Sequence, residues 1–355
     1  MSVSQLLRKD AKLTKDGQGD AAKEVYQSIL DKFPQNQAAR KGLAGLSPAA
    51  KSGGPSQAQL QELLALYNAK KMQEAVDMGR AFLQQFGDHY LVHNILGAVH
   101  LDTGHYVIAM SHFNKVNELA PEYAEGHNNM GAVMNKLRVP EKAVESFERA
   151  IAINPKYAQA HSNRNFELNY VAGLSPQVAF EKHMEYEANF GGSANQMVHR
   201  SDGVVNRRLR VGYVSPDFSA HSVAYFFEPL LAAHDGDRIE TYCYYCETKM
   251  DDTTKRLIGL SDFWRDVAGM DDAALAKRIA EDRIDILVDL AGHSAKSRLR
   301  VFARKPAPVQ VAWLGYPNTT GLKAMDYRFT DAIADPVGAA DELHSEELVR
   351  LDGGI

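Results

Sequence analysis

Identical residues recur at intervals of 34 along the first half of this 355-residue chain, and this period constrains the fold more than any other feature. The recurring types are alanine, histidine, glycine, phenylalanine and proline. They stand at Ala75, Ala109 and Ala143; His93, His127 and His161; Gly97 and Gly131; Phe113 and Phe147; and Pro121 and Pro155. A period of about 34 residues is typical of helix–turn–helix units, which bury a core only by stacking on their neighbours. The pattern therefore predicts a solenoid of paired helices.

The residue types at the recurring positions have physical reasons. Gly97 and Gly131 allow two helices to approach closely, and Phe113 and Phe147 are expected to fill the gap between neighbouring repeats. Proline ends each second helix because it lacks the amide hydrogen that a helix interior needs. Period and patterning together are those of tetratricopeptide repeats.

The helical array is expected over residues 57–190, with a final helix pair from about residue 158 that caps it. An earlier copy of the pattern predicts repeat-like helices over residues 1–45; it consists of Ala22, Tyr26 and Pro34. The segment 46–56 is rich in glycine, serine and proline, which predicts a flexible linker.

A stacked array of this kind offers a concave surface for an extended peptide or a partner helix. The recurring histidines could suggest a metal site. They lie one helix pair apart, however, which is too far for shared coordination at about 2 Å. We therefore interpret them as interhelical contact residues and expect no metal.

From residue 205 the pattern changes to an alternation of strands and helices. Expected strands are 209–215, 239–246, 284–290, 309–314 and 327–330, and expected helices are 222–233, 271–283 and 296–303. Such alternation is typical of a parallel sheet with helices on both faces. We therefore expect a Rossmann-like α/β domain over residues 205–355, after the helical solenoid.

Three loops of this domain follow strands and carry small and polar residues, namely 215–222, 291–296 and 315–321. Loops at the carboxyl ends of the strands form the ligand site of a doubly wound fold. The side chains placed there are Asp217, His221, His293, Tyr316, Asn318 and Thr319. A histidine in a cleft is a candidate general acid or base because its pKa lies near neutrality. The competing interpretation is that each histidine is only a surface residue.

Other signals narrow the class of protein. The chain has neither a glycine-rich dinucleotide fingerprint nor a P-loop, which argues against a dinucleotide oxidoreductase and a P-loop NTPase. Cys243 and Cys246 lie on one expected strand and point to opposite faces, so we interpret them as packing residues. A run of basic residues lies in the expected helix 296–303 and just after it, namely Lys296, Arg298, Arg300, Arg304 and Lys305. We interpret this run as a solvated helix face, with a phosphate contact as the alternative.

Composition indicates a soluble, cytoplasmic protein with no nucleic-acid or membrane partner. The net charge of −5 argues against nucleic-acid binding through bulk positive charge. Two cysteines exclude a disulfide-built secreted scaffold, which makes a reducing compartment the expectation. No signal peptide is evident at the start, and no apolar run reaches the ~20 residues that a membrane helix needs.

Several stretches of the second half, joined to tetratricopeptide repeats, make a specific combination. The stretches are Arg210–His221, Ile286–His293, Arg304–Gly321, Met325–Asp331 and Ala334–Pro336. In these the chain resembles the protein O-linked N-acetylglucosamine transferases and the SPINDLY-type O-fucosyltransferases, together glycosyltransferase family 41. The resemblance covers nearly the whole chain and is most specific in the second half.

This resemblance implies an inverting, metal-independent hexosyltransferase of the GT-B type, which moves a sugar from a nucleotide donor to Ser or Thr hydroxyls of proteins. It implies His221 and His293 as catalytic residues. The implied cleft residues are Asp217, Tyr316, Pro317, Asn318, Thr319, Thr320 and Gly321. The implied donor is UDP-N-acetylglucosamine, with GDP-fucose as the alternative, and no further cofactor is implied.

The helical groove of the family holds peptide backbone through a ladder of asparagines. The matching repeat position holds Ile95, Asn129 and Asn163 in this chain. The resemblance therefore implies an acceptor-peptide groove that uses Asn129 and Asn163 in the later repeats.

The family continues beyond the point where this sequence stops, with a second Rossmann-like unit that binds the nucleotide. We therefore expect a C-terminally truncated chain that shows no appreciable transferase activity alone, or one that a separate polypeptide completes. The alternative interpretation is a tetratricopeptide adaptor with a vestigial catalytic half, whose remaining function is peptide recognition.

Overall fold

A computed structural model describes residues 25–27, 29–30, 36, 39–40, 54–192, 196–199 and 206–354. The chain divides into two compact units, residues 1–126 and 127–355. The helices expected over residues 1–45 and the linker expected over 46–56 lie almost entirely outside the described residues, so these boundaries stay predictions.

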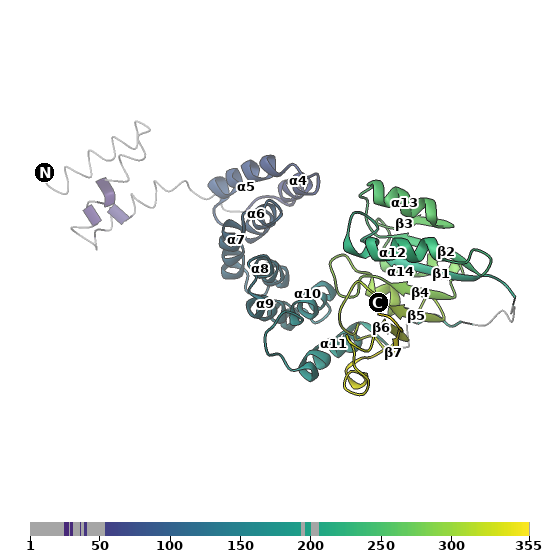
Figure 1. The fold of residues 1–355 in the computed structure, drawn as a ribbon. Coiled ribbons are helices and arrows are strands. Elements are labelled where there is room, and N and C mark those ends of the chain that lie inside the picture. Colours follow the sequence, from purple (N-terminus) through teal and green to yellow (C-terminus); the bar gives the residue numbers. More distant parts are fainter. Residues whose placement is uncertain are drawn as a thin grey trace. The chain divides into compact units, whose positions relative to one another are not determined.

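The first unit contains two complete helix pairs within its described residues (Figure 1). They are α4 (Gln57–Asn68) with α5 (Met72–Phe86), and α6 (Tyr90–Asp102) with α7 (Tyr106–Leu119). Ser56 begins α4 through a capping box with Gln59, which satisfies two backbone amides that the first helical turn leaves open. Apolar side chains such as Leu63, Phe82 and Leu96 form the core between the helices.

Four more helices follow: α8 (Ala124–Lys136), α9 (Pro140–Ile153), α10 (Ala158–Leu168) and α11 (Pro176–Phe190). The recurring glycines explain how each pair packs. A Cβ at Gly131 would lie 2.5 Å from the Phe147 ring, and one at Gly97 would lie 2.6 Å from the Phe113 ring. Each phenylalanine thus packs on the glycine of its own pair, whereas we expected it between neighbouring repeats.

The second unit continues into an α/β domain built on a seven-stranded parallel sheet of order β3-β2-β1-β4-β5-β6-β7. The strands are β1 (Leu209–Ser215), β2 (Ile239–Tyr245), β3 (Phe263–Asp266), β4 (Ile286–Asp289), β5 (Val309–Ala312), β6 (Tyr327–Thr330) and β7 (Glu347–Arg350). The helices are α12 (Ser222–Ala233), α13 (Asp252–Leu260), α14 (Asp272–Glu281), α15 (Leu299–Phe302) and the short 3₁₀ helix η2 (Asp341–Leu343). The chain moves outward from β1 in both directions, which confirms the predicted Rossmann-like fold.

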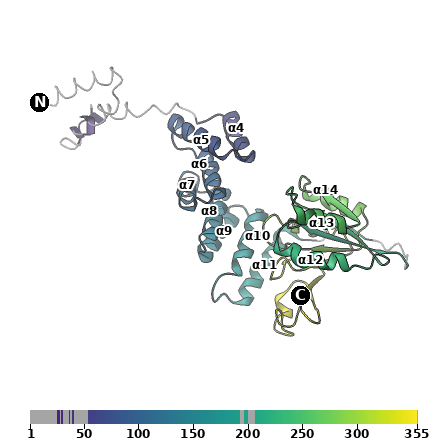
Figure 2. The same cartoon turned by 45° about the horizontal axis from the view of Figure 1, so that its top comes forward.

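Helices cover both faces of this sheet; α12, α13 and α14 are seen beside the strands in Figure 2. One core includes Phe227 of α12 and Leu257 of α13. The other includes Ile279 of α14 and Phe302 of α15, and Tyr186 of α11 also belongs to it. The last helix pair of the solenoid therefore shares a hydrophobic core with the sheet.

Four elements were not predicted from the sequence, namely α13, β3, η2 and β7. The helix expected over 296–303 shortens to the four residues of α15, because the chain before it turns with a positive φ of 63° at Lys296. Cys243 and Cys246 are buried free thiols in different cores, as the packing interpretation predicts, and burial raises the pKa of Cys246 to about 12. Within the described residues, no helix combines the length and apolarity needed to cross a membrane.

Candidate active site

The carboxyl edge of the sheet and the last helices of the solenoid enclose a cavity of about 540 Å³ within the second unit. Loops after β1, β4 and β5 contribute one side of it: Asp217, His221, His293, Ser294, Ala295 and Gly315. Helices α8 to α10 contribute the other, including Asn135, Asn163 and Glu167. The structure thus brings three predicted site residues of the sheet, Asp217, His221 and His293, together with Asn163 of the predicted groove.

His221 occupies the N-cap position of α12. Its Nδ1 accepts a hydrogen bond from the Val223 amide at 3.2 Å, and its side chain is about half exposed. Because Nδ1 uses its lone pair for this bond, the neutral ring carries its proton on Nε2. His221, which lines the cavity, is therefore able to donate a hydrogen bond from Nε2.

Asp217 lies beside this histidine, with its Oδ1 3.9 Å from His221 Nδ1. Burial raises the pKa of Asp217, while the charges of His221 and Lys296 act against that rise. A partly desolvated carboxylate next to an imidazole is a pairing found at many functional sites.

His293 is almost completely buried, and both of its ring nitrogens contact protein atoms. Nε2 lies 2.9 Å from the Thr320 carbonyl, which can only accept, so Nε2 carries the proton. Nδ1 then accepts from the Ser162 hydroxyl at 3.1 Å. Burial, followed by the neighbouring His183, holds the pKa of His293 well below its usual range. This geometry suits a neutral residue that fixes the cavity wall; its predicted catalytic role stays a prediction.

The loops after β4 and β5 approach each other too closely for side chains at two glycines. A Cβ at Gly315 would lie 1.7 Å from the Leu290 carbonyl oxygen, and one at Gly292 would lie 2.2 Å from Cβ of Tyr316. Asp289 shapes the first of these loops by accepting from the amides of Ala291 (3.2 Å) and Gly292 (2.7 Å). Burial nevertheless raises the pKa of Asp289 to about 7.

The rest of the predicted cleft loop lies behind the cavity wall. Thr319 and Thr320 are buried, and both bond Glu346: Thr319 Oγ1 donates at 2.6 Å and the Thr320 amide at 2.7 Å. Asn318 donates to Asn169 at 3.1 Å, and Pro317 lines a separate hollow of about 280 Å³.

Backbone conformation explains the end of this loop. Gly321 has a φ of 64°, and a Cβ there would lie 2.2 Å from the His183 carbonyl oxygen. Of residues 315–321, Gly315 is the one that lines the cavity. The substrate contacts that the resemblance implies for Tyr316 to Gly321 stay predictions.

Amide side chains connect the helices at the solenoid side of the cavity. Asn163 Nδ2 donates to Asn128 Oδ1 at 3.0 Å, and Asn128 Nδ2 lies 3.5 Å from Asn129 Oδ1. Asn163 lines the cavity, and Asn129 contacts Asn128, the partner of Asn163. Ile95 lies in the first unit and is buried.

Sequence reasoning missed two residues of the last repeat that the 34-residue period could have revealed. Glu167 is buried beside the cavity and bonds Asn135, and burial raises its pKa. The matching positions of the earlier repeats hold Val133 and Val99. Asn165 stands where those repeats hold Gly131 and Gly97, and its carbonyl oxygen lies 2.9 Å from the Tyr316 hydroxyl oxygen. Departures from the repeat therefore mark the helix that meets the sheet edge.

The described residues contain no group of three or more histidine, cysteine or carboxylate side chains arranged to hold a metal ion.

Comparison with protein-family models matches residues 193–353 to the family described as Glycosyl transferase family 41. The chain is 42% identical, over 193 residues, to a probable UDP-N-acetylglucosamine–peptide N-acetylglucosaminyltransferase SPINDLY of Solanum lycopersicum. This alignment covers 53% of the chain and 21% of the tomato protein. With the UDP-N-acetylglucosamine–peptide N-acetylglucosaminyltransferase of Caenorhabditis elegans, identity is 37% over 148 residues, which is 41% of this chain and 13% of that protein.

Among solved structures, a mutant O-GlcNAc transferase of Thermobaculum terrenum is similar over both the helical and the α/β parts. Its TM-score is 0.75 at 36% sequence identity, covering 83% of this chain and 57% of that chain. The matched part of this chain spans about a fifth of the length of the tomato relative.

Proposed function

We propose that this chain, whose residues 193–353 match glycosyl transferase family 41, is a member of that family and forms part of the active site of a protein glycosyltransferase. The proposed reaction moves a sugar from a nucleotide donor to a serine or threonine hydroxyl of an acceptor protein. The cavity that holds Asp217 and His221 is its proposed location.

One observation carries this proposal: side chains of the helical repeats and of the sheet edge face the same cavity. Asn163 and Glu167 belong to α10, whereas Asp217 and His221 follow β1. Concave helical arrays bind extended peptides, and the carboxyl edge of a doubly wound sheet binds ligands. A peptide held by the helices therefore lies within reach of the sheet-edge residues.

In the proposed transfer, the acceptor oxygen bonds to the anomeric carbon as the bond from that carbon to the diphosphate breaks. The hydroxyl gives its proton to solvent water, and the nucleoside diphosphate leaves with the electron pair of the broken bond. His221 contributes a hydrogen bond from Nε2, because its Nδ1 already accepts from the Val223 amide. A donor aimed at an oxygen that gains charge stabilises the transition state.

We propose UDP-N-acetylglucosamine as the donor, because the names of the tomato and nematode relatives specify that nucleotide sugar. GDP-fucose is the alternative donor. The proposed acceptor is a protein segment in extended form, held at its backbone by Asn163 and by the Asn128–Asn129 pair.

Sugar transfer tests this function. It is measured on this chain together with any polypeptide that completes its second Rossmann-like unit (the whole protein), because the chain alone is expected to show no appreciable activity. The protein is incubated with an acceptor protein mixture and either UDP-N-acetylglucosamine or GDP-fucose, and modified peptides are identified by mass spectrometry. The proposal predicts one N-acetylhexosamine on serine or threonine with the first donor. Modification with the second donor only would replace the sugar assignment, and no modification with either would contradict the proposed function.

A further inference from the structure

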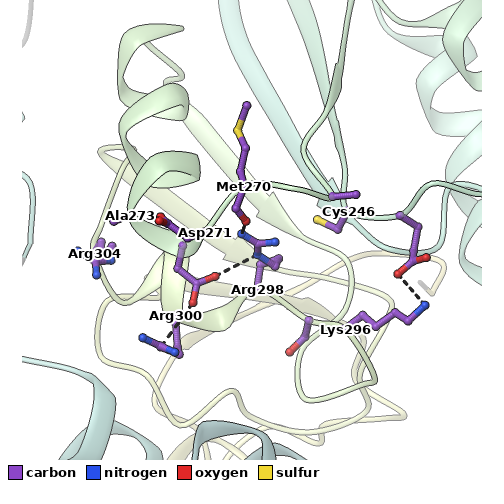
Figure 3. Close-up of a pocket in the computed structure, with 12 residues that line it drawn as sticks. Cys246, Met270, Asp271, Ala273, Lys296, Arg298, Arg300 and Arg304 are labelled. Carbon is purple, nitrogen blue, oxygen red and sulfur yellow. Dashed lines mark hydrogen bonds and ion pairs between the residues drawn. The ribbon is translucent and has the colours of Figure 1, made fainter. Parts of the chain in front are cut away.

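A second cavity of about 600 Å³ lies at the N-terminus of α14 (Figure 3). It is lined by the end of β2, by the turn before α14 and by the segment 296–304. Four cationic side chains surround it, namely Lys296, Arg298, Arg300 and Arg304. The proposed transferase reaction makes no use of these four residues.

The carboxylates of this cavity are already engaged. Asp271 accepts from the Ala274 amide at 2.8 Å as the N-cap of α14. Asp272 lies between two guanidinium groups, 3.1 Å from Nε of Arg298 and 3.5 Å from Nε of Arg300. Glu247, the third carboxylate of the lining, pairs with Lys296 at 2.6 Å.

The guanidinium groups, in contrast, retain N–H donors that the protein does not use. Arg298 is only 13% exposed and is fixed by one bond from Nη2 to the Met270 carbonyl at 2.7 Å. Its Nε is buried and, despite the nearby Asp272, makes no well-directed hydrogen bond. Arg304 is half-buried and has no ion pair or hydrogen bond from its side chain to any part of the chain that the structure describes.

These observations correct the interpretation of the basic run as a solvated helix face. Arg298 is largely buried, Lys305 pairs with Asp326 at 2.5 Å, and α15 spans only four residues between them. A largely buried guanidinium is costly to desolvate unless an anion compensates it. Asp272 supplies one charge for two guanidinium groups, and nothing described supplies one for Arg304.

We propose that this cavity binds an oxyanion of the phosphate type. The planar fork of arginine matches the oxygens of a phosphate group, and charge-assisted bonds of this kind are strong. The first turn of the ten-residue helix α14 adds positive potential at the same place. The phosphate belongs either to a phosphorylated side chain of a protein or to a nucleoside diphosphate.

Direct binding tests the inference without requiring transferase activity. Calorimetry at low salt, where charge interactions are least screened, measures the affinity of the purified protein for inorganic pyrophosphate. Arg304→Gln removes a side chain without partners, so the fold should remain intact, and the affinity should fall roughly tenfold or more. Arg298→Lys keeps the positive charge but removes the planar guanidinium group with its paired N–H donors, so it should also weaken binding.

Lys277→Gln is the matched control, because it removes one positive charge from the exposed face of α14 outside the cavity. It should leave the affinity unchanged. Competition by phosphoserine identifies a modified side chain as the source, and competition by uridine diphosphate identifies a nucleotide. The proposal is overturned if pyrophosphate does not bind, if Arg304→Gln binds it as tightly as the unaltered protein, or if neither competitor displaces it.

Discussion

The Nε2 atom of His183 lies 2.7 Å from the hydroxyl oxygen of Tyr316, and this contact joins α11 to the loop after β5. His183 Nδ1 contacts the Ala179 carbonyl at 2.6 Å, so Nδ1 carries the proton and Nε2 accepts from the tyrosine. Asn169 donates to the same hydroxyl at 3.0 Å. Because Tyr316 directly follows Gly315 of the cavity wall, the solenoid's last helix pair holds that wall in place.

Tyr316→Phe should destabilise the second unit. The change removes one hydroxyl and leaves the fully buried Nε2 of His183 without a partner. An unsatisfied buried group costs about 1–3 kcal/mol, and urea unfolding measures the loss. Tyr170→Phe is the control, because Tyr170 is 58% exposed and its change should be nearly neutral. Equal stability of the two variants would contradict the role assigned to the Tyr316 hydroxyl.

Acid should destabilise the second unit through its buried histidines. Burial lowers the pKa of His183 from 6.5 to about 4 and holds the pKa of His293 well below its usual range. The folded state therefore binds fewer protons than the unfolded state in this range, and the unfolding free energy falls as pH drops from 6.5 towards 4. Each histidine contributes up to about 1.4 kcal/mol per pH unit. A smaller loss of unfolding free energy over that range in a His183→Gln, His293→Gln double variant would support the assignment, and an unchanged profile would contradict it.

The contribution of Asp289 to stability changes with pH in the opposite direction to that of the histidines, because burial raises the pKa of Asp289 from 3.8 to about 7. Its contribution to stability is complete below pH 3.8 and is lost as pH rises towards 7. Asp289→Asn cannot ionise, so its unfolding free energy relative to the unaltered protein should rise between these pH values. Asp237→Asn, at an exposed position, is the control and should show no such trend. A trend of the reverse sign would show that Asp289 is ionised in the folded protein.

Glu167→Val places at this repeat position the valine that the earlier repeats have there, at Val133 and Val99. Because the pKa of Glu167 is raised by burial, removing its carboxylate should leave the unfolding free energy unchanged or higher, within about 1 kcal/mol. Acceptor affinity should fall, measured as a rise in KM for the acceptor with little change for the donor. A variant that loses more than about 2 kcal/mol and keeps its acceptor KM would make Glu167 a structural residue.

Gly131→Ala should destabilise the helical array, because its Cβ would lie 2.5 Å from the Phe147 ring. Overpacking of this kind costs about 1–3 kcal/mol. Gly259→Ala in α13 is the matched control, because its Cβ meets no atom within 4 Å and alanine favours helices. Thermal unfolding should show a lower midpoint for the first variant and an equal or higher one for the second. Equal midpoints for Gly131→Ala and the unaltered protein would mean that the Phe147 ring can move aside.

Much of the fold can be predicted from local sequence patterns. Most of the hydrogen bonds around the candidate site cannot. The 34-residue spacing predicts α6 to α9 because each pair repeats the same glycine–phenylalanine contact. The four-residue strand β3 has the sequence Phe-Trp-Arg-Asp and shows no alternation of apolar and polar residues, whereas β6, of equal length, does alternate and was predicted.

The loops with Asp217 and His221 could be placed because strand ends share an edge in a parallel sheet. The bonds from Glu346 to Thr319 and Thr320 could not be predicted, since 26 or 27 residues separate the partners and no spacing rule connects them. Glu167 could have been found, because it breaks an apolar repeat position.

The role of His221 offers the most direct test of the account. The measurement is kcat/KM for transfer from the accepted nucleotide sugar by the whole protein, its His221→Ala variant and a His199→Ala control at an exposed position. Loss of a donor aimed at developing charge should lower kcat/KM about 100-fold or more, with the control unchanged. A His221→Ala value within about twofold of the unaltered protein would place the reaction outside the cavity described here.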